Sequence, residues 1–133
     1  MAEFQLEIVT PEKRVFSGVV QRFQGPGSEG SFGVLAHHAP MLTSLQIGKI
    51  TFLDAAGKER RMATSGGFAE VGRNQVTLLV ETAEFAEEID TARAKAAHDR
   101  ARELLATKQD VDLGLAQRAL LRALNRLRVG GAL

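Results

Sequence analysis

Residues 76–94 read VTLLVETAEFAEEIDTARA, and the character of the chain changes within this stretch. The run 76–80 is apolar and rich in β-branched residues, which is typical of a strand. Asp90 then precedes an alanine-rich segment, and Asp is a preferred residue at the start of a helix. The stretch therefore predicts a boundary near residues 83–89 between a β-rich part and a helical part.

The part before this boundary contains all seven Phe, all three Pro and ten of the thirteen Gly of the chain. Phe4, Leu6 and Ile8 alternate with polar residues, so they would share one face of a strand. Turn residues separate segment 50–53 from 60–64, and segment 68–71 from 76–80, which predicts two hairpins. Short strands at this spacing predict a small sandwich or barrel.

The part after the boundary is rich in Ala, Leu and Arg, which favour helices. We predict one helix over residues 90–106 and a second that begins near Asp112 and ends at Gly130-Gly131, with a turn over 107–111. Apolar residues of the second helix follow a three-and-four spacing, which predicts a packing seam: Leu113, Ala116, Leu120, Ala123 or Leu124, and Leu127. Helices of this length are marginal alone, so they must pack on each other, on the β-domain or on a partner.

The charge of the chain is divided unevenly. The formal net charge is +1, with 17 basic and 16 acidic residues, but residues 1–90 sum to −4 and residues 91–133 to +5. The segment 113–133 carries four Arg and no acid, whereas a solvated helix face usually mixes signs. Since the forked guanidinium suits phosphates and carboxylates, the second helix predicts an anionic partner. A basic-helix module that binds nucleic acid, or an adaptor, is the alternative, but no aromatic residue follows Phe85 to stack on bases.

The sequence contains no recognisable catalytic or metal-binding framework. The string Gly25-Pro26-Gly27-Ser28-Glu29-Gly30 fits G-x-G-x-x-G, but no helical periodicity follows it, so we predict a turn-rich surface loop. Adjacent His37 and His38 would point to opposite sides of an extended chain, which disfavours a shared metal. There is no Cys and no G-x-S-x-G, hence no predicted nucleophile, cofactor or enzyme activity. We also predict no signal peptide and no membrane-spanning segment.

Four stretches together resemble the epsilon subunit of bacterial F-type ATP synthase, over nearly the whole chain: residues 6–11, 30–40, 65–71 and 89–94. The resemblance implies an α+β fold, with an N-terminal antiparallel β-sandwich over residues 1–86 followed by a C-terminal two-helix antiparallel hairpin over 87–133. It implies a non-catalytic subunit of the F1 central stalk that links gamma to the c-ring in proton-driven ATP synthesis. It also implies a peripheral position at the cytoplasmic face of the bacterial plasma membrane.

The resemblance implies two sets of partner contacts. The segment 30–33, described in the family as a loop, would face the c-ring, and His38 would lie near gamma. Family members often carry a carboxylate where this chain has Ser31, so we expect Glu29 to serve in its place, and they carry Pro-Gly where this chain has Ala36-His37. In an extended state the hairpin would inhibit ATP hydrolysis, with four arginines facing the acidic C-terminal region of a catalytic beta subunit: Arg118, Arg122, Arg126 and Arg128.

The segment Ile89-Asp90-Thr91-Ala92-Arg93-Ala94 also resembles the ATP-binding motif of some bacterial epsilon subunits. By this resemblance ATP is a regulatory ligand that stabilises the compact hairpin, and the site comprises Glu84, Ile89, Asp90, Arg93, Ala94, Arg100, Arg122 and Arg126. A folded hairpin would bring the four arginines around one triphosphate, while Glu84 and Asp90 would accept hydrogen bonds from base or ribose. The alternative is that Asp90 only caps the helix and the arginines serve protein contacts.

Overall fold

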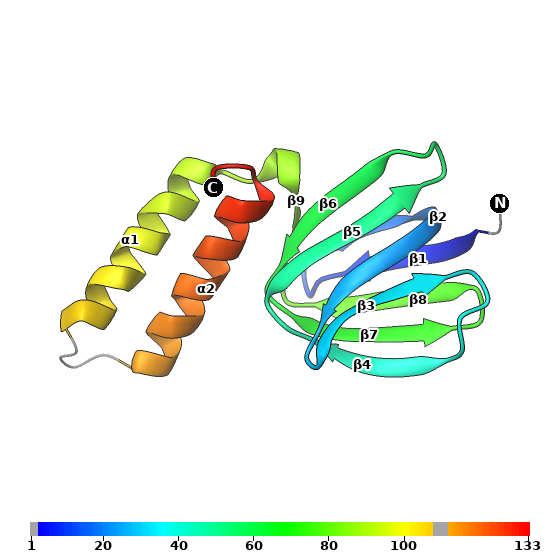
Figure 1. The fold of residues 1–133 in the computed structure, drawn as a ribbon, viewed down its shortest axis with the longest axis horizontal. Helices are drawn as coiled ribbons and strands as arrows, with labels where there is room; N and C mark the ends of the chain where they lie inside the picture. Colours follow the sequence, from blue (N-terminus) through cyan, green and yellow to red (C-terminus); the bar gives the residue numbers. More distant parts are fainter. Residues whose placement is uncertain (1–2, 108–111) are drawn as a thin grey trace.

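The computed structural model describes residues 3–107 and 112–133, which form a β-domain followed by a helical hairpin (Figure 1). Of the turn predicted over 107–111, Thr107 is instead the last residue of the first helix, and residues 108–111 lie outside the described residues. In chain order the elements are β1 (Phe4–Val9), β2 (Arg14–Gly27), β3 (Gly30–Leu35), β4 (Met41–Leu45), β5 (Gly48–Asp54), β6 (Glu59–Thr64), β7 (Gly67–Gly72), β8 (Gln75–Val80), β9 (Ala83–Phe85), the 3-10 turn η1 (Ala86–Glu88), α1 (Thr91–Thr107) and α2 (Leu113–Val129).

The strands form two layers joined by the long strand β2. The pairing order is β1-β8-β7-β4-β2-β5-β6-β9, and β3 pairs with β2 as well. The first half of β2 pairs with β1, while its second half pairs with β3 and β5. The predicted hairpins are confirmed as β5–β6 and β7–β8. The sandwich is antiparallel except for one pair, since β1 and β8 run parallel.

The prediction of a surface loop over residues 25–30 is wrong. Gly25, Pro26 and Gly27 continue β2, Ser28 and Glu29 form a two-residue turn, and Gly30 begins β3. A Cβ on Gly27 would lie 2.6 Å from the carbonyl oxygen of Gly30, so the close approach of the two strands requires glycine there. The segment 30–33 is accordingly a strand and not a loop. No helix follows the glycine string, which also removes the dinucleotide-binding interpretation.

The hydrophobic core lies between the two layers of strands. Phe4, Leu6 and Ile8 are buried as predicted, and they pack with residues of the other strands, among them Phe23, Ile50, Phe52, Met62 and Leu78. The buried residues of this core all precede residue 83, so the described residues of the hairpin add no buried residue to it. The sandwich therefore has its own core.

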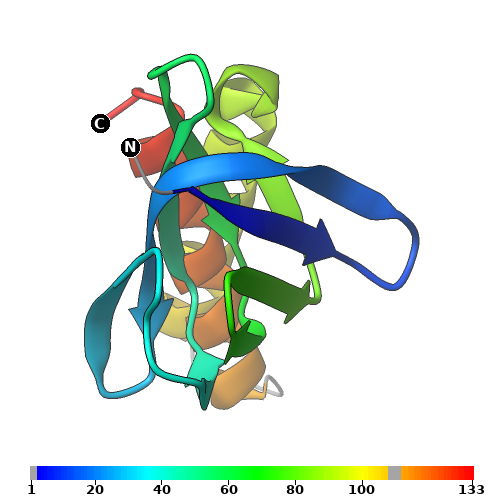
Figure 2. The same ribbon diagram turned by 90° about the vertical axis from the view of Figure 1, so that its right-hand side faces the viewer.

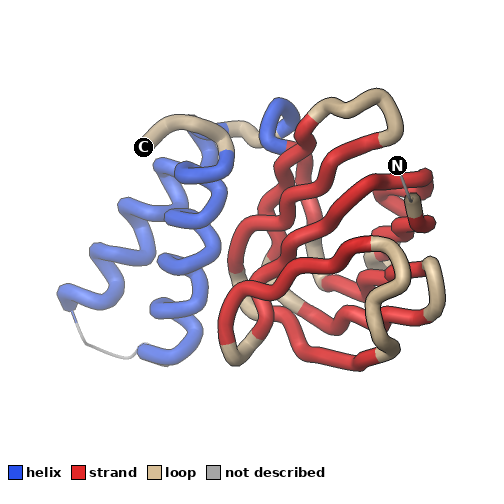
Figure 3. Tube along the Cα trace, turned by 45° about the vertical axis from the view of Figure 1, so that its right-hand side comes forward, coloured by secondary structure: helices blue, strands red, loops and turns tan. Residues whose placement is uncertain are grey.

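The two helices lie at one end of the sandwich (Figures 1 and 3). Seen from the other end, they lie behind the strands (Figure 2). The helix starts are confirmed, because Asp90 Oδ1 accepts a hydrogen bond from Arg93 N at 3.0 Å and Asp112 Oδ1 accepts one from Leu115 N at 3.1 Å. The second helix ends at Val129, next to the predicted Gly130-Gly131, where Gly131 has φ +81°.

The predicted seam of α2 is only partly buried. Ala116, Ala123 and Leu127 are buried and Leu120 is half-buried, but Leu113 is 45% exposed. Leu113 occupies the first position of the second helix. In the described residues, neither helix is long and apolar enough to cross a membrane.

Candidate functional site

The layer formed by β4, β7, β8 and β1 carries apolar side chains on its outer surface. Phe68 on β7 is paired with Leu79 on β8, and Leu79 is paired with Val9 on β1. Ser44 faces Phe68 from β4, so Leu42, two residues earlier, lies on the same surface. We call Val9, Leu42, Phe68 and Leu79 the outer apolar face. Phe68 is 55%, Leu79 52% and Leu42 71% exposed.

Carboxylates and a shallow recess border the outer apolar face. The recess, of about 340 Å³, is lined by Val9, Thr10, Pro11, Gly67, Phe68, Leu79, Val80 and Glu81. Glu70 lies beside Leu42 and opposite Thr77 on the same surface. An apolar patch with a polar rim is typical of a protein-binding surface.

The residues with predicted c-ring and gamma contacts flank opposite ends of β3. Glu29 lies exposed in the β2–β3 turn, and Ser31 is held by a hydrogen bond from Gln24 Nε2 to its Oγ at 2.9 Å. His38 follows β3, and its Nδ1 donates to the Ala39 carbonyl at 2.7 Å. The preceding residue, His37, has φ +67°. The structure therefore separates these residues into two locations and does not assemble them into one site.

The structure brings together three of the residues predicted to bind ATP. Glu84 on β9 forms an ion pair with Arg126 Nε at 2.5 Å, and Arg122 lines the same recess one helical turn earlier. This recess holds about 10 Å³, which is the lower limit for a single water molecule. An adjoining groove of about 360 Å³ is lined by Glu84, Glu88 and Arg126 along with residues of the β1–β2 turn.

The other predicted residues lie along α1 and the exposed side of α2. Ile89 is buried in a small cluster with Ala63 and Val129. Asp90 caps α1, and Ala94, whose N–H donates to the Asp90 carbonyl, is buried. Arg93 and Arg100 are exposed on α1, as are Arg118 and Arg128 on α2.

The connection between the two domains is held by Arg60 of β6. Its guanidinium lies 4.3 Å from the centroid of the Phe85 ring and forms an ion pair with Glu87 at 3.2 Å. The pKa of Glu87 lies below its ordinary value, foremost because its own backbone N–H stabilises the carboxylate and then because of Arg60. Arg60 thus contacts both sides of the point where β9 gives way to the helical part.

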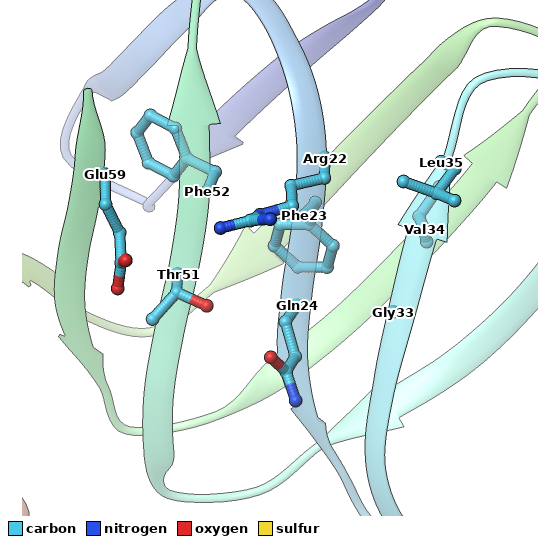
Figure 4. Close-up of a pocket in the computed structure, with 9 residues that line it drawn as sticks. All are labelled: Arg22, Phe23, Gln24, Gly33, Val34, Leu35, Thr51, Phe52 and Glu59. Atoms are coloured by element: carbon cyan, nitrogen blue, oxygen red, sulfur yellow. The ribbon is translucent and has the colours of Figure 1, made fainter. Parts of the chain in front are cut away.

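A wide groove of about 560 Å³ crosses the outer surface of β3, β2 and β5 (Figure 4). Arg22 and Gln24 of β2 lie along it with Thr51 of β5 and Glu59 of β6, and Gly33 leaves its β3 side open. Its side chains supply mixed charge but no nucleophile beside a base. Among the described residues, no group of three or more potential metal ligands comes together.

Two family models match successive parts of the chain. The model described as ATP synthase, Delta/Epsilon chain, beta-sandwich domain matches residues 3–86, and the model described as ATP synthase, Delta/Epsilon chain, long alpha-helix domain matches residues 87–131. The chain belongs to this ATP synthase family. Within the family it is similar to proteins named ATP synthase epsilon chain. The relative from Nitratidesulfovibrio vulgaris (strain DP4) is 53% identical over 127 residues, which cover 95% of this chain and 94% of the relative. The relative from Syntrophobacter fumaroxidans is 50% identical and covers 97% of each chain.

Solved structures show the same fold for this epsilon-family chain. A chain of the Euglena gracilis mitochondrial ATP synthase, solved as OSCP/F1/c-ring, aligns with a TM-score of 0.71 at 25% identity and covers 98% of this chain and 79% of that one. A chain of the Tetrahymena thermophila central stalk and c-ring aligns with a TM-score of 0.60 at 17% identity, over 96% of this chain and 93% of that one. The predicted sandwich followed by a helical hairpin is confirmed.

Sequence reasoning missed the outer apolar face. Leu79 breaks the alternation of the run 76–80, in which Val76, Leu78 and Val80 fill the core. An apolar residue at an outward position of a half-buried strand was the available signal. Phe68 provided no such signal in the sequence, because the outward direction of its side chain depends on the pairing of β7 with β4 and β8.

Proposed function

We propose that this epsilon-family chain is the central-stalk subunit that joins gamma to the c-ring in proton-driven ATP synthesis, without catalysing a reaction itself. The observation that carries the proposal is the outer apolar face, which we assign to gamma. The Euglena and Tetrahymena proteins are named as parts of F1, central-stalk and c-ring assemblies, which supports a place in the stalk. The subunit would then lie peripherally at the cytoplasmic face of the bacterial plasma membrane.

The physical argument for gamma rests on exposed area and location. Phe68, Leu79 and Leu42 are each more than half exposed, and removing such side chains from water stabilises a complex. The face includes the end of β1 and borders Thr10, whereas the groove of Figure 4 lies on the other layer, over β3, β2 and β5. The exposed turn at Glu29 leaves a separate end of the sandwich for the c-ring.

Charge substitutions on the outer apolar face test the gamma contact. In the Phe68→Asp and Leu79→Asp variants, we expect binding to gamma to weaken by about 2 kcal/mol or more, since a carboxylate would be buried without a partner. Co-purification with tagged gamma measures the change. Leu35→Asp is the matched control, because Leu35 is an exposed apolar residue of β3 that lines the groove of Figure 4, outside the outer apolar face. Equal retention of gamma by all three variants would refute the assignment.

We further propose that the hairpin regulates hydrolysis by leaving the sandwich and extending. The sandwich keeps its core without the hairpin, and the arginines of α2 would then be free to face the acidic region of beta. Removing residues 89–133 should raise ATP hydrolysis by the reconstituted complex. Unchanged hydrolysis would leave only the role as a rotor linker.

ATP is proposed as the ligand that favours the compact hairpin, because Glu84, Arg122 and Arg126 already share one recess. Sites for ligands of this size have volumes of about 300–1,000 Å³. The recess of about 10 Å³ is far smaller, so Arg126 must move from Glu84 to admit a triphosphate. The adjoining groove does not offer an alternative site, because the four glutamates that line it repel phosphate groups. ATP shifts the equilibrium only if it binds the compact state more tightly.

Calorimetry on the isolated chain at millimolar ATP tests this site. We expect saturable heat for the wild type, and an affinity at least roughly tenfold lower in Arg93→Ala and Arg122→Ala, since each loses a charge-assisted hydrogen bond to phosphate. Arg102→Ala is the control, because Arg102 is exposed on α1 and outside the proposed set. Absence of saturable heat in the wild type would remove ATP from the mechanism.

A further inference from the structure

The hairpin contacts the sandwich through a narrow strip of α2. α2 packs against β5 and β6, and α1 lies on the far side of α2 (Figure 1). The apolar part of this contact is one small cluster, formed by Ala63, Ile89 and Val129 with Ala86 beside it. Because this apolar contact is small, two neighbouring polar side chains of α2 contribute much of the stability of the contact between the hairpin and the sandwich.

The first of these side chains is Asn125, which reaches the end of the β5–β6 ladder. Its Nδ2 lies 2.8 Å from the carbonyl oxygen of Gly48 and 3.4 Å from that of Thr64, and it donates to both. Gly48 and Thr64 are the cross-strand partners that close this ladder. The Asn125 amide therefore bridges two strands of the sandwich. Asn125 is 77 positions from Gly48 and 61 positions from Thr64 in the sequence.

The second is Arg126, whose ion pair with Glu84 adjoins the Asn125 contacts. Thr64, Glu84, Asn125 and Arg126 line one recess of about 10 Å³, although the side chains of Arg126 and Glu84 remain 31% and 37% exposed. Arg126 is also one of the arginines that would face beta in the extended state. While the hairpin is compact, Arg126 is engaged by the sandwich.

We propose that Asn125 is the latch of the compact state, and that its two hydrogen bonds to Gly48 and Thr64 set how often the hairpin leaves the sandwich. This inference rests on the proposed regulatory function. When the hairpin leaves, water replaces Asn125 at both carbonyls, so the hydrogen bonds contribute a modest net stabilisation. A modest latch keeps the two states close in free energy, as a switch requires.

Asn125 separates the latch from the other proposed roles of α2. It is not one of the residues proposed to bind ATP or to face beta. Because it lines the recess that Glu84, Arg122 and Arg126 share, its effect is measured without ATP. The Asn125→Asp variant keeps the size of the side chain but replaces the donating amide by a carboxylate, which repels both carbonyl oxygens. We expect the ratio of compact to extended chains to fall about tenfold or more.

The experiment measures the distance between the sandwich and α1 in the isolated chain. The sequence has no Cys, so Ala56→Cys and Ala97→Cys, both at exposed positions, give a single pair of spin labels for distance measurement. Asn125→Asp should shift the distribution to longer distances, and Asn125→Ala should shift it less in the same direction. Gln117→Glu is the matched control, because it adds the same charge at an exposed position of α2 and should leave the wild-type distribution.

Wild-type distance distributions in both Asn125 variants would overturn the latch. If circular dichroism shows that the Asn125→Asp chain is unfolded, Asn125→Ala decides the matter alone. The reconstituted complex then separates this inference from the regulatory proposal. A chain that opens and inhibits hydrolysis more strongly supports both, while a chain that opens without changing hydrolysis supports the latch and refutes regulation by the extended hairpin.

Discussion

At the scale of single residues, the backbone of β8 comes so close to Gly67 that only glycine fits at this position. Gly66 has φ +109°, and its N–H donates to Thr64 Oγ1. A Cβ on Gly67 would lie 2.1 Å from the carbonyl oxygen of Leu79 and 2.7 Å from Val80 Cα. Both atoms belong to the backbone of β8, so they cannot move aside as a flexible side chain would. These two glycines allow the start of β7 to lie close to the backbones of β8 and β4.

Gly67→Ala is therefore expected to lower the free energy of unfolding by roughly 3 kcal/mol or more, since strand β7 must shift to accept a methyl group. Urea unfolding measures the change. Gly72→Ala is the control at the other end of the same strand, where the nearest atom to a new Cβ is 3.7 Å away. It should change stability by less than about 1 kcal/mol. Equal unfolding midpoints for the two variants would contradict the argument.

At the scale of elements, the hairpin is packed through alanine. Ala94 and Ala101 of α1 are buried, as are Ala116 and Ala123 of α2, and each pair is spaced by seven residues. This spacing places each pair on one face of its helix. Small side chains bring the two helices close but bury little area, so α1 depends on an uninterrupted contact with α2.

Ala123→Leu should push the helices apart and lower the free energy of opening α1 by about 1–3 kcal/mol, as overpacking does at other buried positions. Hydrogen exchange of the α1 amides measures that free energy. Ala96→Leu provides the comparison, since Ala96 is exposed and Leu is also a good helix former. The packing described for the hairpin would be contradicted if the α1 amides exchanged faster than wild type in the Ala96 variant. It would also be contradicted if they exchanged no faster than wild type in the Ala123 variant.

At the scale of the whole molecule, the sandwich and the hairpin are held by different forces. The apolar core ends with the strands, whereas the hairpin is fixed by Asn125, the Glu84–Arg126 pair, the Arg60 contacts at Phe85 and Glu87, and one small apolar cluster. The charges of −4 and +5 on the two parts add a long-range attraction that salt screens. The core of the sandwich is thus independent of the hairpin, whereas the hairpin depends on its contacts with the sandwich.

A chain ending at residue 88 should fold into the sandwich by itself. We expect its stability in urea to lie within about 1–2 kcal/mol of the transition assigned to the sandwich in the full chain, because it keeps the whole core and both Arg60 contacts. The measurement pairs urea unfolding with an amide NMR spectrum. The isolated segment 89–133 should by contrast be mostly unfolded. A truncated chain without dispersed amide signals would show that the sandwich needs the hairpin.

The division into a β-rich part and two helices followed from local patterns that the sequence displays directly, whereas the choice of a sandwich over a barrel came from the resemblance. Alternation at Phe4, Leu6 and Ile8 gives a half-buried strand, and the side-chain oxygens of Asp90 and Asp112 meet the free N–H groups at the helix starts. These patterns act between residues close in sequence, so one sequence suffices to interpret them. The partner residues at the two ends of β3 and the ATP residues came instead from resemblance, and their roles remain proposals.

Local patterns in the sequence indicated strands around residues 4–8, 50–53, 60–64, 68–71 and 76–80, two hairpins, the helix ends and the division of charge, because propensity, capping and alternation are local. Tertiary structure alone decided the course of β2 through Gly25, Pro26 and Gly27, because pairing with β3 and β5 compensates for residues that otherwise disfavour strands. It also decided which side chains meet across the two domains. Asn125 reaches Gly48 and Thr64 only because the chain returns to the end of the sandwich, and no spacing along the sequence encodes that return.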